Sequence, residues 1–287
     1  MPTFLMTDPD GFDVSYRINP WMDPKAWTPE CLAGAKAASG HLKAALRAAG
    51  AHVETLGPVR GLPDLVFPAN AAVVLDGKVL LARFRHPERQ GEEPVFRSAF
   101  ATLQKRGMVQ EIVDLPEGVL QEGAGDCIWD AERKLFWAGY GPRSSKSSIA
   151  AIRHAFGQEV VALELASDRF YHLDTCFCPL AGGKVLYSPP AFTPAAQAAI
   201  RAHVAETDRI EAAAEEAAAF CVNAVNLGPR VIMARAPATL RAKLEARGYS
   251  LTEIDLDPFI LSGGAAYCMT LRLDRTSQPT PAILAAE

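Results

Sequence analysis

One local pattern recurs along this chain, and it constrains the fold more than any other feature of the sequence. A helical segment ends in a turn that carries Arg, Lys or His, a glycine follows directly, and a short apolar stretch comes next. Basic side chains in the last turn and a glycine just beyond it are what helix C-termini prefer. The glycines that end these helical segments are Gly50, Gly107, Gly157 and Gly248. A repeated helix-to-strand unit therefore organises most of the chain.

Each of these glycines leads into a stretch that resembles a strand, and a second such stretch follows a later turn. The stretches are short and rich in the β-branched and aromatic residues that strands favour. We expect the first kind at 52–56, 109–113, 160–164 and 250–254, and the second kind at 78–84, 134–140, 184–188 and 230–234. Further helices are predicted over 194–204 and 237–247. Because helices and strands alternate, the fold class is predicted to be α/β.

The length of the repeat sets the number of units and their closure. At about 45 to 50 residues a repeat, the chain holds about five units. The fifth is split, with residues 251–273 expected to supply its strands and the helix near 29–49 the rest. A split unit predicts a closed ring in which the chain ends meet, and because no linker interrupts the series, residues 1–287 are predicted to form a single domain. A doubly wound sheet would show the same alternation, but the chain has no dinucleotide-binding glycine motif after a strand and no P-loop.

Composition excludes several classes of partner. The formal net charge is only -4 over 287 residues, so there is no electrostatic reason to expect nucleic acid or an anionic membrane as a partner. No apolar run approaches the roughly 20 residues that span a bilayer, and the N-terminus lacks the basic and apolar regions of a secretory signal. We therefore expect a cytoplasmic protein.

Six cysteines are spread over the chain, and only Cys176 and Cys178 lie close together in sequence. A Cys-x-Cys with no second pair and no suitably spaced histidines is weak evidence for zinc. Cytoplasmic thiols normally stay reduced, and most of these are expected to be buried as small apolar groups. We therefore predict no metal site.

Four segments carry polar residues where the strand pattern calls for a core. In segment 170–177, strand alternation would put His172, Asp174 and Cys176 on one face. In segment 261–271, a Gly-Gly turn would deliver Cys268 to the start of a strand. Carboxylates inside apolar segments are costly unless they are paired or used, so these segments are candidates for a site. The other two are Asp64-Leu-Val-Phe-Pro-Ala-Asn70 and Glu122-Gly-Ala-Gly-Asp126.

Taken singly, each of these residues also has a purely structural interpretation. A lone cysteine on a strand is usually part of a core, and so is a histidine between aromatic residues. Asp64 and Asn70 fit turn positions, which both residue types favour. Arg89 and Arg143 fit surface loops, where arginines are ordinary. The functional interpretation therefore depends on the combination.

In combination, the segments resemble those of the guanidino-group modifying superfamily, the penteins, which includes arginine deiminase, dimethylarginine dimethylaminohydrolase, amidinotransferase and arginine dihydrolase. His172-Leu-Asp174 resembles the family's His-x-Asp signature, and Cys268 matches the place of the nucleophile. Glu122-Gly-Ala-Gly-Asp126 resembles the acidic Gly-rich loop, with one residue more than the Glu-Gly-Gly-Asp of the deiminases. The resemblance covers nearly the whole chain and implies a pseudo-symmetric five-bladed β/α-propeller, in agreement with the repeat.

The resemblance implies a hydrolase that cleaves guanidino C–N bonds through a covalent adduct on Cys268. The guanidinium carbon is a poor electrophile, so attack needs a thiolate, which a bound cation or a charged His172 would favour. His172 would protonate the leaving amine and then take a proton from the water that displaces the cysteine. Glu122 and Asp174 would contact the guanidino nitrogens, with Glu122 also positioning His172. Neither a metal nor an organic cofactor is required.

The resemblance also implies how the amino-acid end of the substrate is recognised. Asp126 and Asp64 would bind its α-ammonium group or hold the surroundings of that group. Arg89 and Arg143 would bind its α-carboxylate, a two-point task that suits the guanidinium fork. The partner expected from this set is a small molecule, arginine or a derivative of it.

Asn70 departs from the deiminase pattern and bears on the extent of the reaction. Deiminases carry an aspartate there, in a Phe-Thr-Arg-Asp signature, whereas this chain has Phe67-Pro-Ala-Asn70. Asparagine offers a donor and an acceptor without charge, so it suits a neutral ureido group as well as a guanidinium. Ile18-Asn19-Pro-Trp-Met22 also resembles arginine dihydrolases, which add a second asparagine to the site. We therefore expect arginine to be converted through a citrulline-level species to ornithine, carbon dioxide and two ammonia molecules.

Alternatives stay open at this point. Asn70 is also compatible with a deiminase or a dimethylarginine hydrolase, both of which release citrulline. Transfer of the amidino group to an acceptor amine, as in amidinotransferases, is a further alternative activity. Outside the enzymes, the alternative is an inactive member of the superfamily that only binds a cationic amino acid. The sequence leaves open the alkyl decoration of the substrate and the oligomeric state, and a homo-oligomer is compatible with it.

Overall fold

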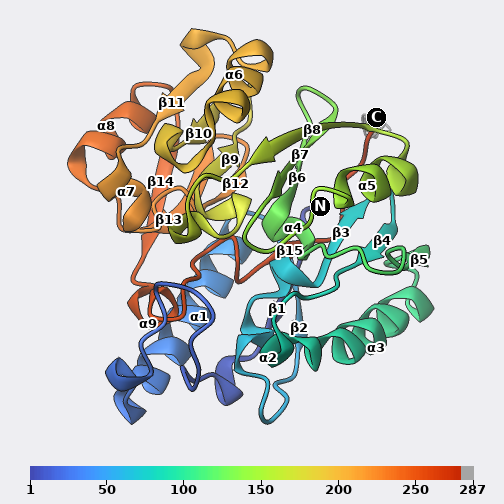
Figure 1. Ribbon diagram of the computed structural model, residues 1–287. Helices are drawn as coiled ribbons and strands as arrows, with labels where there is room; N and C mark the ends of the chain where they lie inside the picture. Colours follow the sequence, from blue (N-terminus) through green and yellow to red (C-terminus); the bar gives the residue numbers. More distant parts are fainter. Residues whose placement is uncertain (279–287) are drawn as a thin grey trace, which may run out of the picture.

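The computed structural model describes residues 1–278, and the strands of this part form five small sheets of three strands each. In Figure 1 the longer helices α1, α3, α5, α6 and α8 lie toward the periphery, and most of the strands lie nearer the middle. The α/β class expected from the alternation is confirmed. None of the helices in residues 1–278 is both long and apolar enough to cross a membrane.

Four of the sheets are each built from one continuous stretch of chain. Two strands pair antiparallel, and a helix then carries the chain to a third strand parallel to the second. A crossover helix is the usual connection between parallel strands. The units are β3 (Ala72–Leu75), β4 (Lys78–Leu81), α3 (Glu92–Lys105) and β5 (Glu111–Val113); β6 (Cys127–Asp130), β7 (Leu135–Tyr140), α5 (Ser148–Phe156) and β8 (Glu159–Glu164); β9 (Phe177–Pro179), β10 (Val185–Tyr187), α6 (Pro194–His203) and β11 (Arg209–Glu211); β12 (Val225–Leu227), β13 (Arg230–Ala234), α8 (Ala238–Glu245) and β14 (Ser250–Ile254).

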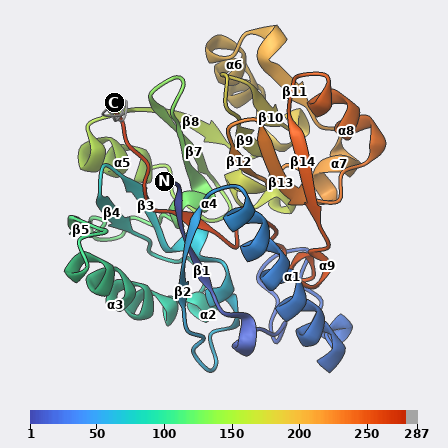
Figure 2. The same cartoon turned by 180° about the vertical axis from the view of Figure 1, so that it is seen from behind.

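The fifth sheet joins the two ends of the described chain. β15 (Leu271–Arg272) pairs antiparallel with β1 (Thr3–Thr7), and α1 (Pro29–Ala48) leads from β1 to the parallel strand β2 (His52–Leu56). Figure 2 shows these blue strands beside the red end of the chain. The predicted split unit is confirmed, but its strands were partly wrong. β14 completes the fourth sheet, and β1 was missed because no helix and glycine precede it.

The local sequence explains where the helices begin and end. All four glycines expected to end helices have a positive φ, as a left-handed C-terminal cap requires. Proline occupies the first position of α1 and of α6, where its missing N–H costs no hydrogen bond. The middle strands of the sheets are almost completely buried, which explains why they read as continuous apolar runs. The four glycines are Gly50 (φ 82°), Gly107 (φ 75°), Gly157 (φ 64°) and Gly248 (φ 84°).

Short helical turns occupy connections both between the units and within them. The short α-helices are α2 (Pro87–Gln90), α4 (Gly123–Asp126), α7 (Ala214–Ala218) and α9 (Asp257–Ile260). The 3-10 turns are Pro9–Gly11, Pro24–Ala26, Pro63–Val66, Pro68–Ala71, Asp168–Phe170, Leu173–Thr175, Pro189–Ala191 and Glu206–Asp208. Several of them lead directly into the first strand of a unit, and these approaches carry most of the polar segments singled out in the sequence.

Two expectations about these segments were wrong. Residues 172–176 do not form a strand, because a 3-10 turn over Leu173–Thr175 precedes β9. Cys176 instead contacts the backbone carbonyl of Leu173 and lies in the core. Cys268 lies in a turn, and β15 begins only at Leu271. All six cysteines are free thiols and five are buried, so the expectation of mostly buried thiols is confirmed.

Candidate active site

Polar side chains gather where the chain enters the first strand of a unit. The six predicted site residues at these positions are each at most 2 % exposed. Buried polar groups need hydrogen-bond partners, so the partners show how the site is held together. The residues are Asn70 before β3, Glu122 and Asp126 before β6, His172 and Asp174 before β9, and Cys268 before β15.

Glu122 is the centre of the buried hydrogen bonds. Its Oε2 accepts from Arg143 Nη1 at 3.0 Å and lies 2.7 Å from His172 Nε2, while its Oε1 accepts from the Arg85 backbone N–H at 3.0 Å. Burial alone would raise the pKa of Glu122, but the Arg143 guanidinium and the hydrogen bond with His172 hold that pKa well below its ordinary value. Because an ionised carboxylate can only accept, His172 carries a proton on Nε2. Its Nδ1 is therefore the nitrogen that can exchange a proton.

Asn70 faces this second nitrogen. Its Nδ2 lies 3.4 Å from His172 Nδ1, and its Oδ1 accepts from Arg89 Nη1 at 2.9 Å. Arginine can only donate, so the orientation of the Asn70 amide is determined by its partners. Arg89 is held in turn by two hydrogen bonds of 2.8 Å to the Glu92 carboxylate. A continuous buried chain of polar groups thus runs from Glu92 to Glu122.

Cys268 lies against a carboxylate and an amide. Its Sγ is 3.1 Å from Asp174 Oδ2 and 3.1 Å from Asn223 Nδ2. Burial raises the pKa of the Cys268 thiol well above its ordinary value, and the neighbouring Asp174 charge raises it further. Burial also raises the pKa of Asp174 to about 7, although hydrogen bonds from Cys268 and Asn223 oppose the shift. In this arrangement Cys268 is a thiol that donates to Asp174.

The second carboxylate oxygen of Asp174 is buried and, among residues 1–278, has no hydrogen-bond partner. A buried acceptor left unpaired costs about 1–3 kcal/mol, and more when it is charged. A guanidinium presents several N–H donors in one plane, so it can pair with Asp174 Oδ1 and bring its carbon next to Cys268 Sγ. Its positive charge would also favour the thiolate. The pair of Asp174 and Cys268 is therefore suited to a cationic, planar substrate.

A cavity of about 550 Å³ opens beside these groups, with Arg143, Tyr171 and Asn19 in its lining. Arg143 donates through Nη1 to Glu122 and through Nη2 to the backbone carbonyl of Ile18. With five N–H groups in all, it keeps others for a carboxylate in the cavity. Arg89 is not among the residues that line this cavity. Of the two predicted carboxylate ligands, Arg143 is thus the better placed, and both roles stay predictions.

Asp64 and Asn19 tie loops around the cavity to the segment that precedes the nucleophile. Asp64 accepts from Ser262 Oγ at 3.0 Å through Oδ1 and from the Tyr16 hydroxyl at 2.9 Å through Oδ2. Asn19 Nδ2 donates to the Ser262 backbone carbonyl at 3.0 Å. The two residues meet at Ser262, so they hold the surroundings of the site. Direct contact of either with a substrate stays a prediction.

Asp126 holds the backbone of the His172-Leu-Asp174 segment. Its Oδ1 accepts from the Leu173 backbone N–H at 3.0 Å, and its Oδ2 accepts from Ser144 Oγ at 2.6 Å. Leu173 lies between His172 and Asp174, so this bond positions both side chains. The predicted acidic loop therefore places its two carboxylates in different roles, with Glu122 on the His172 ring and Asp126 on the backbone.

Glycines allow the segments to approach one another closely. A Cβ on Gly125 would lie 2.1 Å from Asn70 Nδ2, and one on Gly264 would lie 2.3 Å from the Phe67 ring. Gly263 has a φ of 86°, and a Cβ there would meet the Tyr171 hydroxyl at 2.7 Å. These contacts explain why the polar segments are interleaved with glycine.

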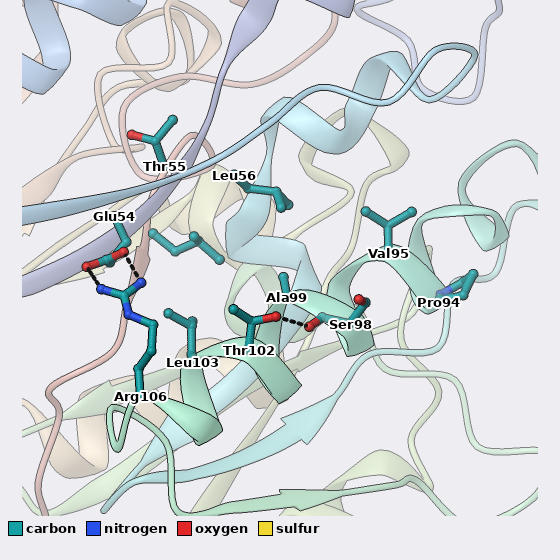
Figure 3. Close-up of a pocket in the computed structure, with 11 residues that line it drawn as sticks. Glu54, Thr55, Leu56, Pro94, Val95, Ser98, Ala99, Thr102, Leu103 and Arg106 are labelled. Carbon is teal, nitrogen blue, oxygen red and sulfur yellow. Dashed lines mark hydrogen bonds and ion pairs between the residues drawn. The ribbon is translucent and has the colours of Figure 1, made fainter.

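A second cavity, of about 510 Å³, lies away from these groups between β2 and α3 (Figure 3). Its lining is largely apolar, and Arg106 donates from both Nη atoms to the Glu54 carboxylate beside it, at 2.7 and 2.8 Å. None of the predicted site residues lines this cavity. Two residues of the predicted set, Asn19 and Arg143, line the first cavity, and Arg143 connects it to Glu122.

Sequence reasoning missed two residues of the buried set. Asn223 interrupts the apolar run Phe220-Cys-Val-Asn-Ala-Val225 just before β12, which is the same signal that identified the other segments. Glu92 is completely buried against Arg89. It carried no such signal, because an acidic residue in the first turn of a helix is ordinary.

Comparison with known proteins relates the chain to enzymes of arginine chemistry. It matches the family model described as N,N dimethylarginine dimethylhydrolase, eukaryotic, over residues 30–275. It is 41% identical over 278 residues to the bifunctional arginine dihydrolase/ornithine cyclodeaminase ArgZ of Synechocystis, a match that covers 96% of this chain but only 38% of that protein. It is 36% identical over 270 residues to the N(G),N(G)-dimethylarginine dimethylaminohydrolase of Mycobacterium tuberculosis, covering 94% of this chain and 85% of that one.

Solved structures extend the likeness to the fold. The N-terminal domain of ArgZ, crystallised as an asparagine-to-serine mutant covalently bound to a reaction intermediate, superposes with a TM-score of 0.91 at 40% identity. The superposition covers 97% of this chain and 100% of that domain. The chain thus spans one domain of the bifunctional relative.

The close approach at Gly125 predicts a steric cost. In Gly125→Ala the new methyl group would displace the Asn70 amide, and overpacking of this kind costs about 1–3 kcal/mol. Gly40→Ala, in α1 with nothing within 4 Å of the new Cβ, is expected to stabilise by up to about 1 kcal/mol. Urea unfolding of both variants measures the difference. Equal stability of the two would show that the segments are not closely packed at Gly125.

The buried Asp174 predicts a pH-dependent stability. Since its pKa is raised from 3.8 to about 7 in the folded protein, its contribution is fully present below the unfolded value and is lost as the pH rises through about 7. A shift of this size corresponds to a loss on the order of 4 kcal/mol. Asp174→Asn should therefore unfold at a higher temperature than the unchanged protein at pH 8, and the gap should narrow toward pH 5.

Calorimetry without substrate checks this expectation. Asp168→Asn, which removes an exposed carboxylate in the lining of the first cavity, is the control and should show no such gap. A melting temperature of Asp174→Asn at or below that of the unchanged protein at pH 8 would contradict it.

Proposed function

Because the chain belongs to the N,N-dimethylarginine dimethylhydrolase family, we propose that it hydrolyses guanidino C–N bonds and that its principal reaction is the arginine dihydrolase reaction. The observation that carries the proposal is the buried Asp174 carboxylate, with one oxygen on the Cys268 thiol and the other unpaired. Arginine brings a group that matches this pair in charge and shape. The activity named for the bifunctional relative supports the choice of arginine.

The first half of the proposed reaction forms a covalent adduct. The arginine guanidinium binds the Asp174 carboxylate, and the Cys268 thiol gives its proton to His172 Nδ1. The Sγ–carbon bond forms as the bond from that carbon to a terminal nitrogen breaks. The leaving nitrogen takes the proton from His172 and departs as ammonia. Glu122, bound to Nε2 at 2.7 Å, stabilises the imidazolium that exists between these proton transfers.

Hydrolysis completes the first cycle. A water molecule gives a proton to His172 Nδ1 while its oxygen bonds to the amidino carbon. The carbon–sulfur bond then breaks, Cys268 is restored with the proton from His172, and the second proton of the attacking water passes to solvent. The product at this stage is a citrulline-level ureido group.

The second cycle acts on this neutral ureido group, and Asn70 is the residue suited to it. Cys268 attacks the ureido carbon, a second ammonia leaves, and water releases a carbamic acid that splits into ornithine and carbon dioxide. Asn70 Nδ2 donates toward the site because Arg89 occupies its Oδ1. A carboxylate at this position would favour a cation over the neutral group, whereas an amide can donate to the ureido oxygen. The covalently trapped asparagine mutant of the ArgZ domain supports such a role for an asparagine.

The finer features of the prediction belong to the same proposal. The five sheets, with the fifth shared by both chain ends, support a single-domain, five-bladed β/α-propeller of the pentein type. We assign Arg143 to the substrate α-carboxylate, with Arg89 acting through Asn70. The cytoplasmic location stays a prediction.

Product analysis tests the proposed activity. Incubation with arginine should yield one ornithine and two ammonia molecules for each arginine consumed, without lasting citrulline. Cys268→Ala should lower turnover at least about 1,000-fold, because the covalent route is removed. Citrulline as the end product would sink the dihydrolase assignment in favour of a deiminase.

Dimethylarginine is the second substrate to test, since both the family model and the mycobacterial relative are named for its hydrolysis. Release of dimethylamine and citrulline at a higher kcat/KM than the turnover of arginine would favour that function. Binding of arginine with no turnover of any guanidine would leave only the inactive binding protein.

Asn70→Asp isolates the second cycle. The carboxylate should still tolerate the guanidinium but disfavour the neutral ureido group and lose the Nδ2 donor. We expect arginine to be consumed with citrulline accumulating, and the turnover of added citrulline to fall at least about tenfold. Arginine consumption serves as the internal control for folding. An unchanged ornithine yield from both arginine and citrulline would show that Asn70 does not determine whether the reaction continues to ornithine.

A further inference from the structure

The fourth unit also sends a buried polar side chain to the site. Asn223 lies two residues before β12 and is 0% exposed. The approaches to β3, β6, β9 and β15 carry the residues already described, so Asn223 fills the corresponding position in the remaining unit. The turn that delivers it contains Phe220 at a φ of 56°, a left-handed conformation that few non-glycine residues adopt.

The orientation of the Asn223 amide is determined by four hydrogen bonds. Its Oδ1 accepts from the backbone N–H groups of Tyr267 at 3.0 Å and Cys268 at 3.2 Å. Its Nδ2 donates to the Asp174 backbone carbonyl at 3.1 Å and lies 3.1 Å from Cys268 Sγ. Reversing the amide would set donors against donors and an acceptor against an acceptor. Asn223 therefore presents an N–H group, and not an oxygen, to the sulfur.

This N–H group acts in surroundings that otherwise disfavour a charged sulfur. The thiol is buried, and the ionisable groups that face it from the neighbouring unit are Asp174 and Tyr171. In the reaction proposed above, the substrate supplies positive charge only in the first cycle, because the ureido group of the second is neutral. The Asn223 donor is present in both, and it carries no charge that would compete with a cationic substrate.

We propose that Asn223 is the fixed hydrogen-bond donor that stabilises the Cys268 thiolate and aims its sulfur at the substrate carbon in both cycles. The proposal rests on the proposed function for the identity of the substrate, but the contact between Asn223 and the sulfur is independent of that function. The residue touches the reacting atom, so its loss should change the chemistry of the thiol more than the binding of arginine.

Alkylation of Cys268 by iodoacetamide across pH measures thiolate formation without any turnover. Asn223→Asp keeps an oxygen for the two backbone N–H groups but replaces the donor by a carboxylate oxygen. We expect the midpoint of Cys268 alkylation, followed on the peptide by mass spectrometry, to rise by at least about one pH unit. With arginine, kcat should fall at least about tenfold, while KM changes less than about threefold.

Asn226→Asp is the matched control. Asn226 also accepts a backbone N–H, from Ala181 at 2.8 Å, and donates to the carbonyls of Gly228 and Arg230, but neither Asn226 nor these partners are hydrogen-bonded to Cys268 Sγ. It should leave the alkylation midpoint and kcat unchanged. A midpoint in Asn223→Asp that matches that of the control overturns the proposal.

A second measurement does not depend on a folded variant. In the unchanged protein labelled with ¹⁵N, the side-chain amide resonance of Asn223 should titrate with the same midpoint as the alkylation and shift when Cys268 is alkylated. A resonance that ignores both changes refutes the proposal even if Asn223→Asp does not fold. If no guanidine is turned over but the midpoint still moves in the variant, the proposed function fails while the role of Asn223 at the sulfur stands.

Discussion

The carboxylate of Glu122 can remain charged inside this protein only because three donors converge on it. The Arg143 guanidinium, the His172 ring and the Arg85 backbone N–H reach it from three different connections of the chain. Removing one partner from a buried ion pair typically costs about 3–5 kcal/mol, because the other charge is left uncompensated. The positions of those connections, and hence the mutual placement of the units, are coupled to this single group.

From Glu122 the buried series of polar groups continues through His172 and Asn70 to Arg89, and it sets the orientation of the His172 ring and the Asn70 amide. His172 Nδ1 is not bound to Glu122, the Asn70 amide faces it, and Arg89 together with Glu92 holds the Asn70 amide in place. In this buried series of polar groups, the Asn70 amide and the His172 ring are each oriented by a neighbour that can only donate or only accept. In the proposed reaction, such pre-organisation would let the site act on a substrate without reorganising its own dipoles.

Asp174, to which we assign substrate binding, is by contrast only partly paired with other groups. Asp174 is buried with a raised pKa and an oxygen that is unpaired among the described residues. The burial that we expect to weaken the folded protein near neutral pH also leaves an oxygen with which a guanidinium could pair in the proposed reaction. Asp174 is therefore the carboxylate expected to lower the stability of the folded protein. The neighbouring carboxylates of Glu122 and Asp126 are paired with groups that fix the surrounding segments.

The sequence by itself determined the features that depend on near neighbours in the chain. Glycines such as Gly157 marked helix ends because a left-handed cap is a local requirement, and apolar runs marked the strands. The polar segments, including Cys268 and His172, stood out because they interrupt those runs. Local pattern was not enough for segment 172–176, where the spacing suited a strand but a 3-10 turn formed. It was not enough for β1 either, which pairs with β15 at the other end of the described chain.

Only the tertiary structure decided which oxygen meets which nitrogen. Asn223 and Asp174 flank the same sulfur although 49 residues separate them, and Asn70 meets His172 across 102 residues. Hydrogen-bond partners so distant in sequence are chosen by the packing of whole units against one another, a constraint that no local pattern carries.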